Sequence, residues 1–391
     1  MKEGWEYKKI KDIGSVIAGT TPNTNVAEYW DGNLCWISPA ELDGSHYLYD
    51  SRKKITAAAV KAKSLKLLPE GTVILSSRAP IGKVVINKVP TYCNQGFKCV
   101  VCGKEVYNEF LYWWFWGKTD YLNSLGTGAT FKEISKKVVE EIIIPVPPLS
   151  EQQSIVDYLD SAFAKIDAMK ANAEKALNEA RGLFQASLKE MLEPKEGWEE
   201  KKLKEVGRTQ TGTTPSKSVK SFYGGDIPFI RPAELDIDGR GSIEYNSELK
   251  LTTEGALKSR TIRANSTLMC CIGSVGKTGY ATKDVTCNQQ INTITPYEGY
   301  NDKFVYYALL APSFQNEVIK IANSAKATLA IISKGKWEEL SIHIPLLSEQ
   351  HSIVVTLDSL NSKVARLQAN YDKISQECDA LKQAILRQVF E

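Results

Sequence analysis

The stretch Pro147-Pro148-Leu149-Ser150-Glu151-Gln152 marks the point where one kind of structure ends and another begins. An apolar, proline-bearing stretch precedes it, whereas residues 150–192 contain no proline and one glycine. Ser150 is a suitable N-cap and Gln153 stands at the capping-box position, so the sequence predicts that a long helix starts here. The motif returns 198 residues later as Ile344-Pro345-Leu346-Leu347-Ser348-Glu349-Gln350, before a second helical pattern of similar length.

Other stretches also recur, at distances of 193 or 194 residues. The pairs are Lys2-Glu3-Gly4-Trp5-Glu6 with Lys195-Glu196-Gly197-Trp198-Glu199, Gly19–Pro22 with Gly212–Pro215, Pro39–Leu42 with Pro232–Leu235, Ile81–Lys83 with Val275–Lys277, and Cys93–Gln95 with Cys287–Gln289. Two copies of nearly 200 residues are too large for solenoid repeats, so they indicate a duplicated domain. A few small loop insertions account for the drift in the distance between copies.

The predicted domain order follows from the repeat and the two motifs. Residues 1–148 form a first domain, 149–193 a central long helix, 194–346 a second domain and 347–391 a C-terminal long helix. Short runs rich in Val, Ile, Tyr and Phe, separated by Gly, Pro and Asn turns, predict that both domains are β-rich. Each domain is expected to contain one substantial helix, at 108–123 and at 303–322. The fold class is therefore α+β with an internal repeat.

The two long helices carry apolar or small residues at heptad spacing. In the first helix these are Ile155, Leu159, Ala162, Ile166, Met169, Ala173, Ala176, Ala180 and Leu183, and in the second Ile353, Leu357, Leu360, Val364, Leu367, Tyr371, Ile374, Cys378, Leu381 and Ile385. About 40 residues of helix span roughly 60 Å, which exceeds the width of such a domain. We therefore expect the two stripes to bury each other as an antiparallel, coiled-coil-like pair that separates the domains about a pseudo-two-fold axis.

Composition sets outer bounds on function. The 391 residues are 43% hydrophobic and 24% charged, which is typical of a globular protein. The longest strongly apolar stretch is far shorter than the roughly 20 residues of a membrane-spanning helix, and no secretory signal is evident, so a cytoplasmic location is expected. The eight cysteines lack the dense spacing of a secreted disulfide scaffold, which predicts reduced thiols. A net charge of +3 requires any DNA-binding surface to be local.

Two similar domains on a fixed spacer match the symmetry of double-stranded DNA, on which a two-fold protein contacts two half-sites. Basic residues cluster in both domains, and the sequence stretches concerned are 52–54, 61–66, 132–137 and 334–336. Such runs are more often merely solvated than in contact with phosphate. Because the two domains differ in sequence, they would bind an asymmetric, bipartite site.

Candidate DNA-binding residues are the polar and basic side chains near the repeated motifs, since these types can contact base edges and phosphates. They are Thr20, Thr21, Ser77, Arg78, Lys83, Asn94, Gln95, Thr130 and Lys132 in the first domain, and Thr213, Thr214, Arg231, Ser274, Lys277, Asn288, Gln289, Gln290 and Lys334 in the second. Residues common to both domains more naturally maintain the fold or grip the backbone. The difference in base reading is therefore expected where the domains diverge, at Ser77/Cys271 and Arg78/Ile272.

Taken whole, the chain resembles the specificity subunits of type I restriction-modification systems, on the strength of the doubled junction motif and the Gly-Trp start of each half. The resemblance covers essentially all 391 residues. It implies a non-catalytic subunit in which each domain recognises one half of a split DNA sequence and the helices set the spacing. It also implies docking of two methyltransferase subunits and, through them, of restriction subunits. S-adenosylmethionine, Mg²⁺ and ATP would be bound by those partners, with no cofactor or metal in this chain.

Two other classes of function are weighed against this interpretation. A stand-alone enzyme that modifies or nicks DNA could use the P-loop-like residues 271–278 or an acidic cluster of Asp238 with Glu248. The first has Cys271 where the P-loop needs glycine, and its repeat partner also lacks required residues, so a shared turn between strands explains both copies better. The second alternative is a scaffold whose domains and helices bind other proteins.

Overall fold

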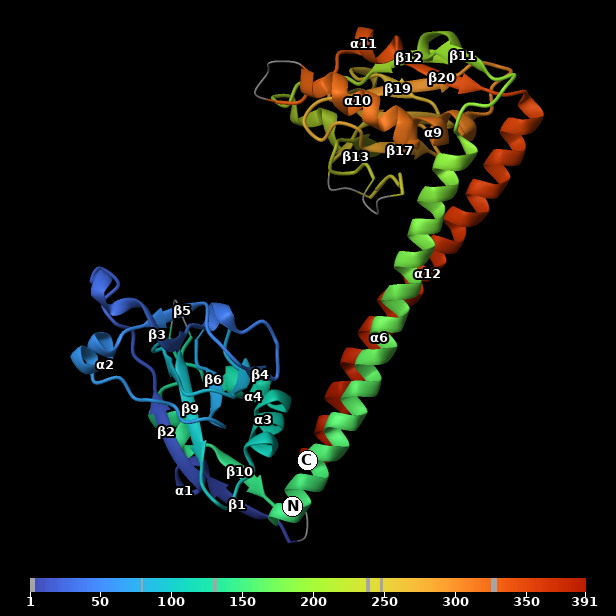
Figure 1. Cartoon of the computed structure of the whole chain (residues 1–391). Coiled ribbons are helices and arrows are strands. Elements are labelled where there is room, and N and C mark those ends of the chain that lie inside the picture. Colours follow the sequence, from blue (N-terminus) through green and yellow to red (C-terminus); the bar gives the residue numbers. More distant parts are fainter. Residues whose placement is uncertain (1–3, 79, 129–131, 237–239, 247–248, 325–328) are drawn as a thin grey trace. The chain divides into compact units, whose positions relative to one another are not determined.

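The structure is a computed structural model that describes residues 4–78, 80–128, 132–236, 240–246, 249–324 and 329–391. It divides into two compact units, one formed by residues 1–172 and 373–391 and the other by residues 173–372. Each unit holds one β-rich domain, called head one (residues 4–148) and head two (residues 195–346) (Figure 1). The helices α6 (Leu149–Met191) and α12 (Leu347–Phe390) contribute to both units, and their bounds confirm the predicted long helices.

Head one contains ten strands within its described residues. They are β1 (Glu6–Lys9), β2 (Gly14–Ala18), β3 (Trp30–Ile37), β4 (Tyr47–Leu48), β5 (Lys53–Ile55), β6 (Val73–Ser76), β7 (Val84–Asn87), β8 (Thr91–Cys93), β9 (Phe97–Cys102) and β10 (Ile143–Val146). A five-stranded sheet has the order β2-β9-β6-β7-β4, and a three-stranded sheet has the order β5-β3-β8. Every residue of β6 and β7 is buried, including the polar Ser76 and Asn87 at the ends of the two strands.

Head two repeats this plan with small changes. Its strands are β11 (Glu199–Lys202), β12 (Gly207–Thr211), β13 (Tyr223–Ile230), β14 (Lys250–Leu251), β15 (Thr261–Ile262), β16 (Ser266–Cys270), β17 (Thr278–Ala281), β18 (Val285–Cys287), β19 (Ile291–Pro296) and β20 (Ser341–Ile344). The sheets have the orders β12-β19-β16-β17 and β14-β13-β18-β15. In both heads a two-stranded ribbon, β1-β10 or β11-β20, joins the start of the head to the strand that precedes a long helix.

Short helices complete each head. In head one they are α1 (Ile10–Ile13), α2 (Ala57–Lys63), α3 (Asn108–Gly117), α4 (Thr119–Leu125), α5 (Lys136–Glu141) and the 3₁₀ turns η1 (Ala27–Tyr29) and η2 (Pro39–Glu41). In head two they are α7 (Leu203–Val206), α8 (Thr253–Leu257), α9 (Asp302–Leu310), α10 (Pro312–Ser324), α11 (Lys334–Glu338) and η3 (Lys220–Phe222).

The helices predicted at 108–123 and 303–322 each consist of two shorter helices. In head two the break falls at Pro312, which has no N–H for the helical hydrogen bond. In head one it follows Gly117, a residue of low helix propensity, and Lys118 has a non-helical ψ of 24°. A Cβ at Gly117 would lie 3.2 Å from the Leu386 side chain of α12, so the glycine also permits close packing there.

The buried stripe of α6 differs from the predicted heptad. Met169, Ala176 and Leu183 are exposed, whereas Phe163, Leu177, Phe184 and Leu188 are buried. Buried pairs still stand seven residues apart within each unit, as Leu159 with Ile166 and Leu177 with Phe184, but Ile166 and Leu177 stand eleven apart, so the predicted heptad does not continue through the middle of the helix. The stripe predicted for α12 is buried or partly buried except for Leu381, which is exposed.

The core of each head continues into the long helices. In unit one, the aromatic residues of α3 form one cluster with Val156, Leu159 and Phe163 of α6 and with Leu386 and Phe390 of α12. The end of α12 runs antiparallel to the start of α6 there, because Lys382 lies over the Phe163 ring while Cys378 contacts the carbonyl of Ile166.

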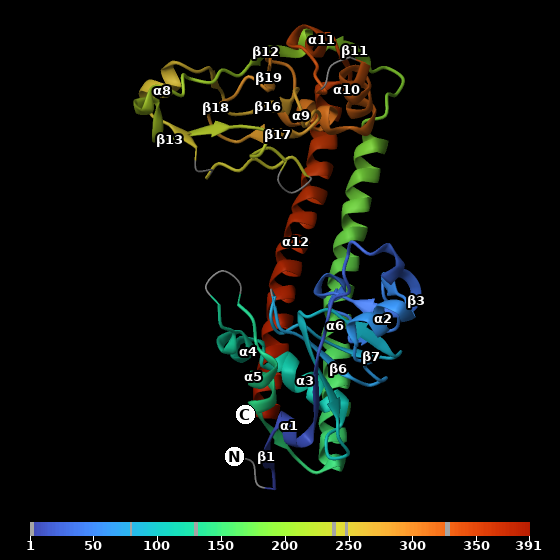
Figure 2. The ribbon, with the colours of Figure 1, turned by 90° about the vertical axis from the view of Figure 1, so that its left-hand side faces the viewer.

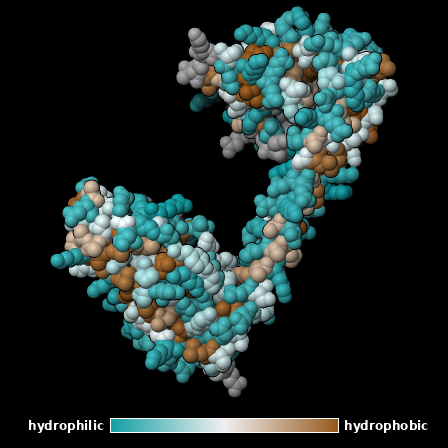
Figure 3. All heavy atoms as spheres, in the orientation of Figure 1, coloured by the Kyte–Doolittle hydropathy of each residue, from teal (hydrophilic) through white to brown (hydrophobic). Residues whose placement is uncertain are grey.

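In unit two, α9 packs with Leu177 and Phe184 of α6. Figure 2 shows α9 and α10 beside the long helices and α8 and β13 at the other end of head two. On the face drawn in Figure 3, hydrophilic residues cover most of each unit, with small hydrophobic areas between them. Of the helices that the structure describes, none combines the length and the apolar character needed to cross a membrane.

Candidate nucleic-acid interface

The repeated Ser-Glu-Gln motif forms the connection between each head and its long helix. Gln152 is fully buried, accepts a hydrogen bond from the Tyr107 N–H at 2.8 Å, and donates to the carbonyls of Glu105 and Pro147. Gln350 does the same in head two, accepting from the Asn301 N–H at 2.8 Å and donating to the Pro345 carbonyl. The motif therefore serves the fold, because each glutamine satisfies backbone groups where a helix begins beside the head.

A second contact between head and helix also recurs with different residues. Trp113 of α3 donates its indole N–H to Asp160 of α6 at 2.9 Å. At the equivalent place in head two, Tyr307 of α9 donates its hydroxyl to Asp358 of α12 at 2.7 Å. The two heads thus preserve the position of the hydrogen bond while changing its donor.

The repeated Gly-Thr-Thr-Pro segment packs on the repeated Cys-Asn-Gln turn. In head one the Thr20 N–H bonds to the Cys93 carbonyl at 2.8 Å, and Thr21 donates to Gln95. A Cβ added at Gly19 would lie only 1.9 Å from the carbonyl oxygen of Asn94, so this close approach requires glycine.

Head two repeats these contacts. The Thr213 N–H bonds to the Cys287 carbonyl at 2.9 Å, and Thr214 donates to Gln289. Asn288 is buried and bonds to Gln290. The structure therefore brings these predicted residues together in each head, where Gln95 and Gln289 are exposed and the asparagines shape the turn.

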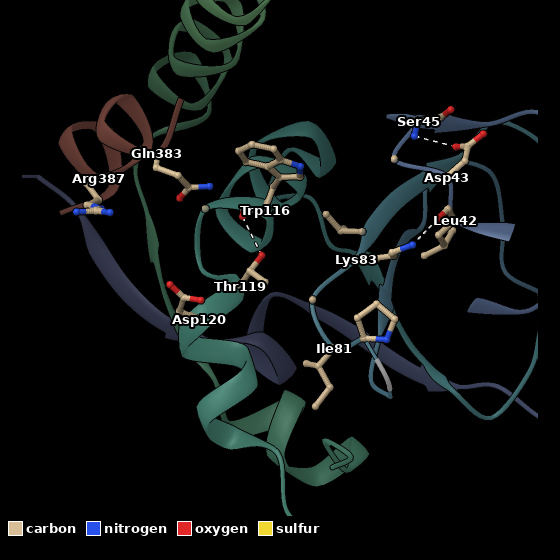
Figure 4. A pocket seen from close by; sticks show the side chains of 15 residues that line it. Leu42, Asp43, Ser45, Ile81, Lys83, Trp116, Thr119, Asp120, Gln383 and Arg387 are labelled. Atoms are coloured by element: carbon tan, nitrogen blue, oxygen red, sulfur yellow. Dashed lines mark hydrogen bonds between the residues drawn. The ribbon is translucent and has the colours of Figure 1, made fainter. Parts of the chain in front are cut away.

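The shared lysines contact backbone carbonyls of their own head. Lys83 Nζ lies 2.7 Å from the Leu42 carbonyl oxygen, and Lys277 Nζ lies 3.4 Å from that of Leu235. Figure 4 shows Lys83 directed toward Leu42 at the wall of a cavity of about 630 Å³, with Trp116, Asp120 and Arg387 on other sides. Both lysines follow the turn of a two-stranded hairpin, β6-β7 or β16-β17, as the shared-turn explanation of the P-loop-like residues requires.

Head one contains a polar network next to this hairpin turn. Lys98 of β9 is only 5% exposed, and its ammonium group lies 3.0 Å from Ser77 Oγ and 3.2 Å from Glu133 Oε1. The other carboxylate oxygen of Glu133 lies 2.9 Å from Arg78 Nε. Burial raises the pKa of the Glu133 carboxyl, but Arg78 and Lys98 outweigh this effect and hold that pKa below its usual value. Glu133 is therefore ionised at neutral pH.

At the equivalent positions, head two is apolar or neutral. The bridge between Arg78 and Glu133 corresponds to the bridge between Ile272 and Ile331. The strand pair Leu75–Lys98 corresponds to Met269–Asn292, and the Ser77 carbonyl accepts from Ile134 as the Cys271 carbonyl accepts from Ile332. Cys271, Ile272, Asn292 and Ile331 thus replace Ser77, Arg78, Lys98 and Glu133. The divergence predicted at the first two positions extends to the other two.

The remaining predicted residues occupy separate places. Lys132 and Ser274 are exposed, Arg231 pairs with the buried Glu234, and Lys334 pairs with Glu338. Thr130, Asp238 and Glu248 lie outside the described residues. Among the described residues, no group of three His, Cys, Asp or Glu side chains could hold a metal ion.

Head two also has a basic hollow of about 420 Å³, lined by Arg208, Thr209, Gln210, Arg260, Thr261 and Lys334. Arg260 donates to the Thr211 carbonyl at 2.7 Å, next to the Gly-Thr-Thr-Pro segment. The sequence singled out Lys334 alone among these residues, because the two arginines lie on different strands and loops. Lys98 and Glu133 were missed for the same reason, being 35 positions apart in the chain.

Comparison with known proteins agrees with this architecture. The model of the family described as "Type I restriction modification DNA specificity domain" matches residues 2–179 and 195–376. The MjaIX type I restriction enzyme specificity subunit of Methanocaldococcus jannaschii is 36% identical over 250 residues, which are 59% of this chain and 58% of that relative. The match thus spans less than two thirds of the relative's length.

Two solved structures share the fold. A protein from a study of complex assembly and conformational transition of the type I R-M system matches with a TM-score of 0.79 and 21% identity, over 100% of this chain and 98% of the other. The HsdS subunit of Thermoanaerobacter tengcongensis matches with a TM-score of 0.60 and 19% identity, over 100% and 97% of the two chains.

Proposed function

We propose that this chain, which belongs to the family of the type I restriction modification DNA specificity domain, recognises a bipartite DNA sequence, with one half-site bound by each head. The observation that carries the proposal is the duplicated fold with divergent side chains at equivalent positions. Head one has Arg78 and Glu133 where head two has Ile272 and Ile331. A two-headed protein with equal heads would bind a symmetric site, whereas these heads favour an asymmetric one.

In this proposal the two recognition domains, built around the heads, span residues 1–148 and 194–346, and the helical segments 149–193 and 347–391 set the spacing between half-sites. The helices also offer the docking surface for two methyltransferase subunits, through which restriction subunits join. The chain itself is a non-catalytic, cytoplasmic subunit, and S-adenosylmethionine, Mg²⁺ and ATP are bound by its partners. Electrostatic contacts to DNA phosphates come from exposed cations such as Arg208 and Arg260 in the basic hollow.

The direct test is to express the chain with the methyltransferase whose gene is expected next to its own and to map methylated adenines across the host DNA. We expect one bipartite motif with a fixed spacer. Absence of new methylation, despite a stable complex of the two proteins, would contradict DNA recognition by this chain.

The spacing role has a separate test. Removing one helical turn from α6 and one from α12 at facing positions should change the required spacer and leave both half-sites as they were. An unchanged spacer would show that the helices do not set the distance.

A protein scaffold makes a different prediction about salt. If Arg260 contacts a phosphate, Arg260→Gln should reduce the slope of log affinity against log salt concentration by about one. The exposed Lys283, which lies over Tyr245, provides a matched charge-removing control, Lys283→Gln, outside the hollow. DNA affinity that is independent of salt in the parent protein would favour the scaffold.

A further inference from the structure

The polar network of head one has apolar or neutral residues at the equivalent described positions of head two, and its most exposed side chain is that of Arg78. Residues common to both heads cannot make them recognise different sequences, since they present the same chemistry twice. A difference in recognition must therefore come from equivalent positions with different chemistry that also reach the surface. Arg78, with 44% of its side chain exposed, meets both conditions.

The burial of Lys98 shows that the network is a built feature. A lysine ammonium that is removed from water destabilises a protein unless it is paired and hydrogen-bonded. Lys98 has three partners for its three N–H groups, namely Ser77 Oγ at 3.0 Å, the Gln95 carbonyl at 3.2 Å and Glu133 at 3.2 Å. Head two places the neutral Asn292 at this position, so the fold does not itself require a lysine.

Glu133 connects the buried Lys98 with the exposed Arg78. One of its carboxylate oxygens contacts Lys98 and the other contacts the Nε atom of Arg78. The two residues also form a backbone bridge, which fixes the start of the Arg78 side chain. An arginine held through Nε is partly ordered before a ligand arrives, and preorganisation of this kind lowers the entropic cost of binding.

We propose that Arg78 recognises a guanine in the half-site bound by head one, and that Glu133 and Lys98 are positioning residues that hold its guanidinium for this contact. The proposal rests on the function proposed above. Guanine presents two acceptors, O6 and N7, on its major-groove edge, and the paired N–H donors of arginine match them. The side chains of Ile272 and Ile331 cannot donate a hydrogen bond, so head two makes no such side-chain contact at the equivalent place.

The test selects preferred sequences from a duplex DNA library in which two randomised blocks flank a variable spacer. The full chain is used, alone and with methyltransferase subunits, at one fixed salt concentration. For Arg78→Gln we expect the preference for guanine to fall about fivefold to a hundredfold at one position of one half-site. The other half-site and the spacer should stay unchanged, which also shows that the variant is folded.

Two variants test the positioning role. Glu133→Gln keeps the size of the side chain but removes its charge, and Lys98→Met removes the buried ammonium. Both should weaken the preference at the same guanine, by less than Arg78→Gln does. The matched control is Lys132→Gln, which removes an exposed charge from the neighbouring residue and should change affinity for all sequences alike.

Each outcome bears on the inference. If Arg78→Gln selects the parent sequence, or changes a position where the parent prefers a base other than guanine, the assignment is wrong although the proposed function stands. Loss of preference in both half-sites would make Arg78 a general structural residue and would also overturn it. If the parent chain selects no sequence with or without methyltransferase, the proposed function itself fails.

Discussion

The two heads differ least where they join the long helices and most beside the β6-β7 and β16-β17 hairpins. At the junction, Gln152 and Gln350 are buried and make equivalent hydrogen bonds. Beside the hairpin, head one has a buried Lys98 at the position where head two has a buried Asn292. The contrast teaches that the repeated motifs of this sequence maintain a common fold, whereas the residues between them carry what distinguishes the heads.

An intermediate case lies between these two regions, on the helix that packs against each long helix. Glu109 of α3 contacts His46 at 2.7 Å and Lys88 at 3.6 Å, whereas Lys303 at the equivalent position of α9 pairs with Asp358. The charge is reversed while the backbone arrangement is kept. Side-chain chemistry at a fixed place in the fold can therefore change without moving the elements around it.

The largest change in stability is expected when one buried aromatic residue of α6 is replaced in each unit. Phe163 packs with α3 and Phe184 packs with α9, and both are nearly fully buried. Phe163→Ala and Phe184→Ala should each lower the free energy of unfolding by about 3–5 kcal/mol, because a cavity is left behind. Chemical denaturation would measure this loss, and hydrogen exchange would locate it in the unit concerned.

Exposed neighbours on the same helix are the matched controls. Met169→Ala and Leu183→Ala should change stability by no more than about 0.5 kcal/mol, since both side chains are more than half exposed. A large loss of stability from Leu183→Ala would instead support the heptad stripe predicted from the sequence, in which Leu183 is buried. A much larger loss from one phenylalanine than from the other would show that the two units are not held in equivalent ways.

The next effect concerns the junction. Gln152→Leu and Gln350→Leu preserve side-chain size but leave the N–H groups of Tyr107 and Asn301 without an acceptor, which should cost about 2–3 kcal/mol each. The measurement is the free energy of unfolding, with Gln153→Leu as the exposed control one residue further on. If either glutamine can be replaced at no cost, the motif does not act as the structural connection described here.

The sequence predicted features with local signals well. The bounds of α6 and α12 follow from the proline before each helix and an uninterrupted helical pattern, but the predicted N-cap is wrong, because α6 begins at Leu149 and Ser150 lies inside its first turn. The stripe of α6 was predicted less well, because the buried positions change register between Ile166 and Leu177 and do not follow one heptad along the whole helix. Alanines at several predicted seam positions gave too weak an apolar signal to reveal this change.

The candidate site was predicted in part. The divergent positions Ser77 and Arg78 could be found by aligning the two halves, because the hairpin motif beside them fixes the alignment. Lys98 and Glu133 could not, since their pairing depends on a strand register and on a bridge between distant segments. Among the predicted residues, Lys83 and Lys277 show how sequence alone cannot separate a lysine that binds phosphate from one that binds a carbonyl.

A smaller effect is expected at Glu109, whose charge is opposite to that of Lys303 at the equivalent position of head two. Burial raises the pKa of this carboxyl, but His46, Tyr47 and Lys88 outweigh it, so the pKa is lowered on folding. A lowered pKa adds stability above the ordinary glutamate pKa, and this contribution disappears as the pH falls through the folded-state value. Glu109→Gln should therefore be less stable than the parent by about 1–2 kcal/mol at pH 7.

The difference between parent and Glu109→Gln should shrink below about pH 4, which denaturation at several pH values would reveal. Glu105→Gln provides the control, because Glu105 is largely exposed and solvent screens its pair with Lys8, so this variant should match the parent in stability at each pH. A difference between parent and Glu109→Gln that stays constant from pH 7 to pH 3 would mean that the charge of Glu109 does not stabilise head one.

The smallest changes are expected at the shared lysines, Lys83 and Lys277. Replacing them tests whether they stabilise the fold or contact DNA. Lys83 lies closer to its carbonyl acceptor than Lys277 does to either of its own, so Lys83→Met should cost about 1 kcal/mol and Lys277→Met less. Neither should alter the slope of log affinity for DNA against log salt concentration, because counterions leave DNA where a cation neutralises a phosphate, and these ammonium groups are directed at carbonyls of their own heads. A slope reduced by about one in either variant would instead place that lysine in the DNA interface, on a phosphate. Different slopes for the two variants would extend the divergence of the heads from base recognition to backbone contact.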